Sequence, residues 1–373
     1  MIYFVIFTIS TVLMGLAELT SKRRQLFILT VILALAAVLV LAIFGAIRAD
    51  SVGTDTGTYN RYFMVAVNST NFTTFHYDFK HIDQSEFGFT VLNYVISRFT
   101  HSPQGFELVC GLIVDLNVCW ALFLMRRWIS ITLGWITFCA LFYGTSIDIL
   151  RQSIAMSMVL LAVAFLYYGK YLRSFLLICL AITLHTTAIL GFLIFATGYL
   201  FHRARSRQQR AVVNFSLVVF TIILPFLIEA LSSFGAFTDK YNSYMTQGQS
   251  FPLITTIGVR LPMLIMVLWS MLACHGRLQR MTIWIYSLII QEFLMFPLFF
   301  ISPVVGRLVL YFGIAKVIGY PMALHYSGFA SGGVRFVIDL FYIGMLIFIF
   351  YNQVIINNNG EIFPYVVNSN FLY

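Results

Sequence analysis

Continuous apolar runs separated by short polar segments dominate the chain. Runs of about 15 to 25 residues have the length that an α-helix needs to cross the hydrocarbon core of a bilayer. A transmembrane barrel would instead alternate apolar and polar positions, so the unbroken runs favour helices. The pattern predicts an all-α polytopic membrane protein with about 12 transmembrane helices (11–13). The runs fall at about 2–20, 26–47, 104–125, 129–144, 149–168, 172–184, 187–201, 211–231, 256–273, 281–300, 305–325 and 334–351.

Two places in this pattern allow more than one interpretation. The runs 172–184 and 187–201 are short for full crossings. They predict either two short helices or one helix broken at His185-Thr186-Thr187. Residues 86–100 are half apolar and predict a re-entrant segment or an interfacial helix.

Composition supports the membrane class. The chain is 60% hydrophobic and 10% charged, whereas soluble domains carry about 25% charged residues. No internal repeat or domain boundary is visible, so we expect residues 1–373 to form a single integral membrane domain. The net charge of +9 comes from small basic clumps between apolar runs, which argues against nucleic-acid binding. The five cysteines lack metal-ligand spacing, and we expect no metal and no cofactor.

Basic clumps also predict the orientation. Lys22-Arg23-Arg24 follows the first run, which places that loop in the cytoplasm and the N-terminus outside. If the following crossings alternate in direction, all the remaining tight basic clumps also lie on the cytoplasmic side. Two sizeable loops, about 48–85 and 232–255, and a C-terminal tail of about 352–373 then lie on the outer face.

This topology gathers scattered polar residues into one outer layer. Ionisable groups at membrane depth are costly, so they are candidates for a functional site. Asp55 lies in a loop from Arg48 to Tyr59 that is either a sugar- or phosphate-facing loop, with Asp55 as a base, or an ordinary loop held by Asx-turns. The layer comprises Arg48, Asp50, Asp55, Glu86, Asp148, Arg151, His185, Arg260 and Arg307.

Residues 148–185 hold the densest set of these groups. Asp148 and Arg151 are three apart and share a helical face, with Gln152 beside them. They predict either a structural ion pair or an arginine that binds an anionic ligand and is oriented by Asp148. His185 predicts a general base, a proton relay or a hydroxyl-binding group, or else a histidine satisfied by a backbone carbonyl. Because the intervening chain crosses inward and returns, we expect Arg151 and His185 to meet.

Two arginines near the starts of later helices extend the candidate site. Arg260 precedes Pro262, and Arg307 follows Gly306 with Tyr311 one turn later. Each alone is typical of an interfacial arginine. Together with Arg151 they would supply three cations to one pyrophosphate.

The ordered set of these motifs resembles the EpsG family, which groups with Wzy-type O-antigen and capsule polymerases. The resemblance spans nearly the whole chain. It rests on Val52-Gly53-Thr54-Asp55 with Tyr59 and Phe63, Glu86-x-Gly88-Phe89, Asp148 with Arg151-Gln152-Ser153-Ile154-Ala155, His185-Thr186-Thr187-Ala188, Arg307-x-x-x-Tyr311-Phe312, and Pro364-Tyr365.

The resemblance implies a GT-C-like membrane glycosyltransferase acting on undecaprenyl-diphosphate-linked glycans at the periplasmic face of a bacterial inner membrane. Membrane lipids, a chain-length regulator and a flippase are the implied partners. On this interpretation Arg151 and Arg307 bind the diphosphate, with Arg48 or Arg260 assisting. His185, or else Asp55 or Asp148, acts as the base. Glu86, Gln152, Tyr59 and Tyr311 are the candidates for sugar binding.

Two other functions remain open at this stage. A lipid-linked oligosaccharide flippase would commonly carry internal repeats and a polar site at the midplane, whereas the polar residues here lie at one face. An O-antigen ligase would use nearly the same chemistry to join a finished chain to the lipid A core. A purely structural scaffold would tolerate replacement of Arg151 and His185.

Overall fold

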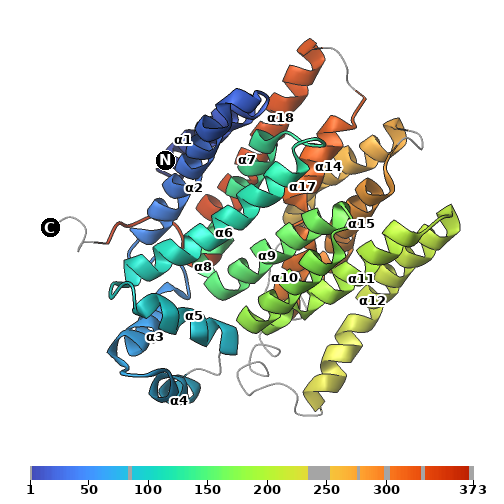
Figure 1. The fold of residues 1–373 in the computed structure, drawn as a ribbon. Coiled ribbons are helices and arrows are strands. Elements are labelled where there is room, and N and C mark those ends of the chain that lie inside the picture. The colour runs from blue at the N-terminus through green and yellow to red at the C-terminus, as the bar shows by residue number, and fades with distance from the viewer. Residues whose placement is uncertain are drawn as a thin grey trace. The chain divides into compact units, whose positions relative to one another are not determined.

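The computed structural model describes residues 2–82, 86–233, 253–274, 278–297, 303–328 and 332–368. Across these ranges the chain is helical and contains no strand, as the sequence predicts (Figure 1). Five helices in these ranges are long and apolar enough to cross a membrane, which makes the chain a polytopic membrane protein. They are Ile2–Ser21, Arg24–Ala46, Pro103–Met125, Leu150–Tyr167 and Gly332–Ile356.

Several of the predicted crossings form helices that are shorter than a full membrane span or are broken. The run predicted at 305–325 forms two helices, Gly306–Gly313 and Lys316–His325, bent by 41°, and would be a sixth span if counted as one. Helix Ile131–Leu141 is also short for a crossing. The total of about twelve crossings therefore stays a prediction. Of the predicted outer loop 232–255, residues 234–252 lie outside the described ranges.

The helices group into two compact units, whose division passes through α9 (Leu150–Tyr167) and α10 (Tyr171–Leu184). The first unit comprises residues 1–161, 176–188 and 330–373. Its other helices are α1 (Ile2–Ser21), η1 (Arg24–Leu26), α2 (Phe27–Ala46), α3 (Thr56–Asn68), α4 (Phe72–Ile82), α5 (Phe87–Ser97), α6 (Pro103–Met125), α7 (Ile131–Leu141), α8 (Tyr143–Asp148), α18 (Gly332–Phe350), η4 (Tyr351–Ile356) and η5 (Asn359–Glu361).

Local sequence explains where these helices begin and how they pack. Ser102 caps α6 by accepting a hydrogen bond from the Gly105 amide at 3.0 Å, and Pro103 occupies the first turn. The antiparallel pair α1 and α2 is joined by the short η1 turn. Ser10 bridges this pair because its hydroxyl donates to the Ala37 carbonyl at 2.8 Å and accepts from Trp135 of α7 at 2.9 Å. Small residues and buried hydroxyls at such contacts are typical of helices packed in a membrane.

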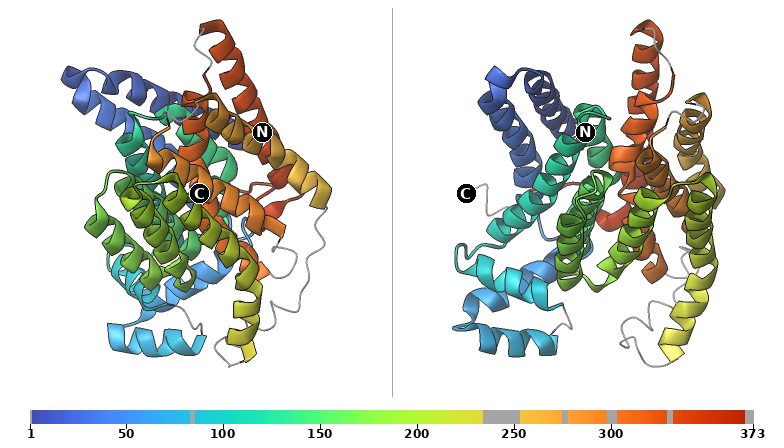
Figure 2. Two further views of the ribbon diagram at one scale, coloured as in Figure 1. Left: turned by 90° about the vertical axis from the view of Figure 1, so that its right-hand side faces the viewer. Right: turned by 45° about the vertical axis from the view of Figure 1, so that its right-hand side comes forward.

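Residues 48–85, predicted as a loop, contain two helices of their own. Helices α3 and α4 lie with α5 beyond one end of α2 and α6, an arrangement that Figure 1 and both views of Figure 2 show. Aromatic side chains bind this group together, with Phe63 stacked on Phe106 of α6 and Phe75 stacked on Tyr94 of α5. Glu86 immediately precedes α5 and so lies within this group.

The C-terminal tail packs back on the start of the loop after α2. Hydrogen bonds join Ala49 N to Val366 O at 2.8 Å and Asn368 N to Ile47 O at 2.9 Å. Tyr365 donates to the Phe44 carbonyl, and Tyr3 donates to the Ile362 carbonyl at 2.7 Å. The tail therefore forms a strap over the segment that carries Arg48.

The second unit comprises residues 162–175 and 189–329. Its helices are α11 (Leu190–Arg203), α12 (Arg207–Ser233), α14 (Leu253–Ala273), α15 (Arg280–Met295), α16 (Pro303–Gly313) and α17 (Lys316–His325). Buried hydrogen bonds link them. Trp284 donates to the Thr197 hydroxyl at 3.2 Å, and Gln291 donates to the Leu217 carbonyl at 2.8 Å. The centre of α15 thus packs against both α11 and α12.

Candidate functional site

The Glu86 carboxylate joins three segments that are far apart in the sequence. Its Oε1 lies 2.8 Å from Nδ1 of His185 and accepts from the Thr186 amide at 2.9 Å. Its Oε2 lies 3.3 Å from Nη1 of Arg151. The structure therefore brings together the arginine and the histidine that the sequence predicts to meet, and it does so through a carboxylate that the sequence placed with the sugar-binding groups.

His185 occupies the break between α10 and α11. Helix α10 ends at Leu184, and a short 3-10 turn, η2 (Thr186–Ile189), precedes α11. The predicted break at His185 is thus present, and the choice between two short helices and one broken helix stays a prediction. Because the helix stops there, the Thr186 amide is turned toward Glu86 rather than toward the preceding turn.

The contact with Glu86 determines which ring nitrogen of His185 is available. An ionised carboxylate only accepts hydrogen bonds, so Nδ1 is the donor. The neutral ring then carries its lone pair on Nε2. That atom is buried and has no hydrogen-bond partner among the residues that the structure describes. A buried acceptor of this kind calls for an explanation, and a ligand hydroxyl is one.

Aromatic rings support the Arg151 guanidinium. Its central carbon lies 5.7 Å from the ring centre of Tyr59 and 5.5 Å from that of Phe89. Both rings are buried, with 4% and 0% of their surface exposed. Cation–π contacts and the Glu86 carboxylate hold the guanidinium in one orientation. Tyr59 thus contacts the predicted phosphate-binding arginine, while its predicted role in sugar binding stays a prediction.

Close packing of α5 on α10 positions Glu86. A Cβ atom built on Gly88 would lie 2.4 Å from Oγ1 and 2.6 Å from the backbone oxygen of Thr183. Only glycine allows the two backbones to approach this closely. This approach brings Glu86, two residues before Gly88, into contact with His185, two residues after Thr183.

Electrostatics keep Glu86 ionised. Burial by itself would raise the pKa of this carboxyl. The hydrogen bond from His185, the Arg151 guanidinium and the Thr186 amide outweigh burial and lower the pKa to about 2. The group therefore acts as a permanent acceptor that orients His185.

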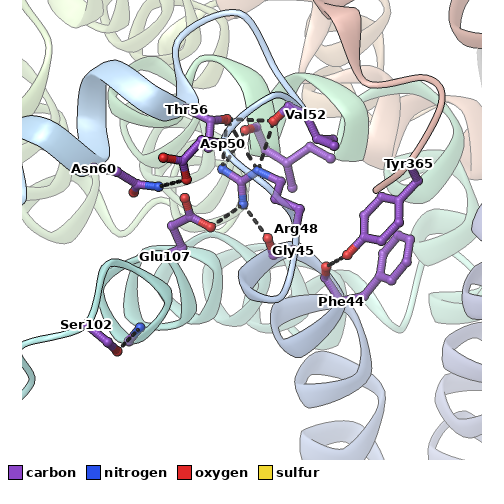
Figure 3. Close-up of polar contacts among 12 residues, drawn as sticks. Phe44, Gly45, Arg48, Asp50, Val52, Thr56, Asn60, Ser102, Glu107 and Tyr365 are labelled. Atoms are coloured by element: carbon purple, nitrogen blue, oxygen red, sulfur yellow. Dashed lines mark hydrogen bonds and ion pairs between the residues drawn. The ribbon is translucent and has the colours of Figure 1, made fainter. Parts of the chain in front are cut away.

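Arg48, predicted to assist in diphosphate binding, lies in a separate buried network of the same unit (Figure 3). Its Nη1 forms an ion pair with Glu107 of α6 at 2.9 Å and donates to the Gly45 carbonyl, and its Nη2 donates to the Ile147 carbonyl at 2.8 Å. Both charged side chains are 2% exposed. The guanidinium thereby ties α2, α6 and α8 together, which favours a structural role.

A small cavity lies beside this network. Its volume is about 10 Å³, enough for one water molecule, and its lining includes Arg48, Glu107 and Asp115. Oε1 of Glu107 and Oδ2 of Asp115 are buried without a hydrogen-bond partner in the described part of the chain. A water in this cavity would satisfy such atoms.

Asp148 contacts the glycine-containing loop that carries Asp55. Its Oδ1 accepts from both the amide and the hydroxyl of Thr54 at 2.7 Å. Burial raises the pKa of Asp148, and the hydrogen bonds from Thr54 act in the opposite direction. Asp55 precedes α3 and is half buried. The two candidate bases are thus close to each other, and their catalytic roles stay predictions.

The remaining predicted residues divide between the units. Gln152 follows Arg151 on α9 and is buried. Arg260, Arg307 and Tyr311 lie on α14 and α16 of the second unit. Arg260 pairs with Glu292, Arg307 is partly buried, and Tyr311 is fully buried.

The sequence pattern does not single out the buried acids Glu107 and Glu292, and it indicates no role for Lys316. Each has its ionic partner on a different segment of the chain, at a separation that no local spacing rule detects. Their only sequence signal is an ionisable residue inside an apolar run. Within the described ranges, no group of three or more His, Cys, Asp or Glu residues is arranged to hold a metal ion.

Comparison with known proteins agrees with the motifs. A family model described as the EpsG family matches residues 31–367. No curated protein and no solved structure matches the chain. The matched region includes every residue of the Glu86, Arg151 and His185 site.

Proposed function

Because the chain belongs to the EpsG family, whose membership suggests a polysaccharide polymerase type of role, we propose that it joins undecaprenyl-diphosphate-linked repeat units into a surface polysaccharide. We place the reaction at the periplasmic face of a bacterial inner membrane, following the basic-clump topology. The observation that best supports this proposal is the arrangement around Glu86, in which one carboxylate orients a histidine and holds an arginine.

The geometry supports a direct transfer with His185 as the general base. A hydroxyl of the acceptor sugar hydrogen-bonds to Nε2 of His185. The base takes the proton as the hydroxyl oxygen forms a bond to the anomeric carbon of the donor glycan. The bond between that carbon and the lipid diphosphate breaks, and the diphosphate leaves with its electron pair.

Arg151 is suited to the leaving group. A guanidinium donates parallel hydrogen bonds that match phosphate oxygens, and negative charge grows on those oxygens as the bond breaks. Glu86 holds Arg151 and His185 on its two oxygens, so the cation for the leaving group and the base for the nucleophile have a fixed spacing. The proton on the imidazole then passes to the departing diphosphate or to water.

A genetic experiment tests the overall function. Removing the gene from its host and examining surface glycan should convert long chains into single-repeat chains. Unchanged ladders would rule out the polymerase. Full-length polymer that accumulates on the lipid carrier without ligation would indicate the ligase, and translocation without bond formation by the reconstituted protein would indicate the flippase.

Replacing His185 tests the assignment of the base. We expect His185→Gln to lower polymerisation by about 10²–10⁴-fold, the range for loss of a general base. Polymerisation is measured with purified protein and lipid-linked repeat units. His101→Gln is the matched control, because His101 is exposed in the connection between α5 and α6. A His185→Gln protein that folds and keeps full activity would remove His185 from the mechanism.

A further inference from the structure

Three ionisable side chains meet inside the second compact unit. Nζ of Lys316, the first residue of α17, lies 2.5 Å from Oε1 of Glu292 on α15. Nη1 of Arg260 on α14 lies 3.8 Å from the same oxygen. The side chains of Lys316 and Glu292 are 8% and 6% exposed, and that of Arg260 is 19% exposed. The cluster is therefore built from three helices and largely shielded from solvent.

The charges in this cluster do not balance. Among the residues that the structure describes, two cations share one carboxylate here, which leaves an excess of one positive charge. An uncompensated buried charge is costly, so a site with this composition favours an anionic ligand. A structural ion pair alone would require only one of the two cations.

Unused hydrogen-bonding groups point to the same conclusion. Nη1 of Arg260 is buried without a hydrogen-bond partner among the described residues, and so is Oε2 of Glu292. The Lys316 ammonium has three donors, and Glu292 provides it with a single close oxygen. The cluster thus offers several donors and one acceptor, the combination that a partly protonated phosphate satisfies.

The surrounding structure holds these groups in place. Helices α16 and α17 are separated by a 41° bend, and Lys316 begins the second of them. Gly313 at the end of α16 packs against Glu292, since a Cβ there would lie in ordinary van der Waals contact with the Glu292 Cγ, at 3.4 Å. The Arg260 guanidinium lies 3.8 Å from the ring centre of Phe296. Broken helices with polar groups at the break are tolerated in membranes where they line a cavity or a binding site.

We propose that Arg260, Lys316 and Glu292 of the second unit form a phosphate-binding site, and that it takes the phosphate headgroup of a polyprenyl lipid. The identity of the lipid rests on the proposed function, because polymerisation requires a donor and an acceptor that each carry a lipid diphosphate. Arg151 serves the diphosphate that leaves. The cluster of Arg260, Lys316 and Glu292 supplies a guanidinium and an ammonium for the diphosphate of the acceptor.

The test counts bound lipid on the full-length protein in nanodiscs. Radiolabelled undecaprenyl diphosphate is the probe, and inorganic pyrophosphate is the comparison. We expect two bound equivalents of lipid for the unsubstituted protein, and one each for Arg151→Met and Lys316→Met. Lys316→Arg, which keeps the charge, should retain two. A folded Lys316→Met protein that still binds two equivalents would overturn the proposal.

The two probes separate the sources of the phosphate. Lipid binding that inorganic pyrophosphate displaces only weakly supports a lipid headgroup. Equal binding of pyrophosphate and lipid at this cluster would overturn the assignment to a lipid. Lipid binding is measured without turnover. If the Arg151→Met protein still binds one equivalent of lipid, that result supports the second phosphate-binding site even if the protein is shown not to be a polymerase.

Glu292→Gln is expected to strengthen probe binding at this cluster, whereas Lys316→Met is expected to abolish it. Removing the carboxylate raises the excess charge from one to two, so probe affinity at this cluster should rise by about tenfold, as expected for one added charge-assisted hydrogen bond. Bound probe should also restore the thermal stability of this variant. If the cluster were only a structural ion pair, Glu292→Gln would be destabilised and the probe would not stabilise it, which would refute the site.

Discussion

At the residue scale, the candidate site depends on one carboxylate with two differently used oxygens. Oε1 of Glu86 orients His185 and also accepts from Thr186, whereas Oε2 holds Arg151. The sequence singled out His185 and Arg151 by residue type and depth. It could not pair them with Glu86, because side chains 99 and 65 positions apart meet only in the folded chain.

The low pKa of Glu86 predicts a specific dependence of stability on pH. Its pKa falls from an ordinary 4.5 to about 2 in the folded chain, so its carboxylate stabilises the fold fully above about pH 4.5. That contribution is lost as pH falls from 4.5 through 2. At 1.36 kcal/mol per unit, it amounts to about 3 kcal/mol.

Thermal unfolding in detergent from pH 6 to pH 3 measures this contribution. The stability difference between the unsubstituted protein and Glu86→Gln should shrink as pH falls. A difference that stays constant over this range would contradict the assignment of the low pKa to Glu86.

The Arg48 network predicts a structural effect. Arg48→Met leaves the buried Glu107 carboxyl without its ionic partner, so we expect unfolding to become easier by about 3–5 kcal/mol. The double variant Arg48→Met/Glu107→Gln should recover part of that loss. Arg61→Met, at an exposed position of α3, is the control. If Arg48→Met left stability intact and weakened lipid binding alone, the earlier diphosphate-binding prediction would be favoured over the structural role.

At the element scale, the close approach of α5 and α10 decides whether the site exists. These two short apolar helices are adjacent because Gly88 has no side chain at the point of contact with Thr183. Sequence patterns predicted the broken helix at His185 as one of two alternatives. They contained no information on which segment covers the break, since packing partners of short apolar helices are set by shape rather than by periodicity.

Substitution of Gly88 tests this packing. Gly88→Ala should push α5 away from α10, separate Glu86 from His185 and reduce polymerisation strongly, at a cost in stability of about 1–3 kcal/mol. Gly344→Ala on α18 is the control, because an added Cβ there meets no atom within 4 Å. Both variants are compared in the polymerisation assay and by thermal unfolding. Normal activity in Gly88→Ala would show that the contact is dispensable.

At the scale of the whole molecule, the two termini of the first unit meet. The C-terminal strap contacts α1 through Tyr3, the end of α2 through Tyr365, and the loop after α2 through Val366. Gly360 of the strap has a φ of 77° and packs so closely on Asp148 that a Cβ would lie 2.8 Å from Oδ2. The strap therefore holds the segment that positions Arg48 and Thr54.

Truncation tests the strap. A chain ending at Ile356 lacks the strap contacts of Ile362, Tyr365, Val366 and Asn368, so we expect a lower unfolding temperature and loss of polymerisation. A chain ending at Asn368 keeps these four contacts and is the matched control. Equal stability of the two truncated proteins would show that the strap contributes nothing to the first unit.

The sequence by itself determined the class of this protein and the chemistry available to it. The length of an apolar run relative to a bilayer is a local property, so helical membrane segments and the family motifs are readable without a structure. Only the tertiary structure decided which ionisable groups share a site. It joined Glu86 to His185 and Arg151, buried Arg48 against Glu107, and placed two cations on Glu292. These pairings depend on contacts between distant segments, where burial and charge act together over a few ångströms.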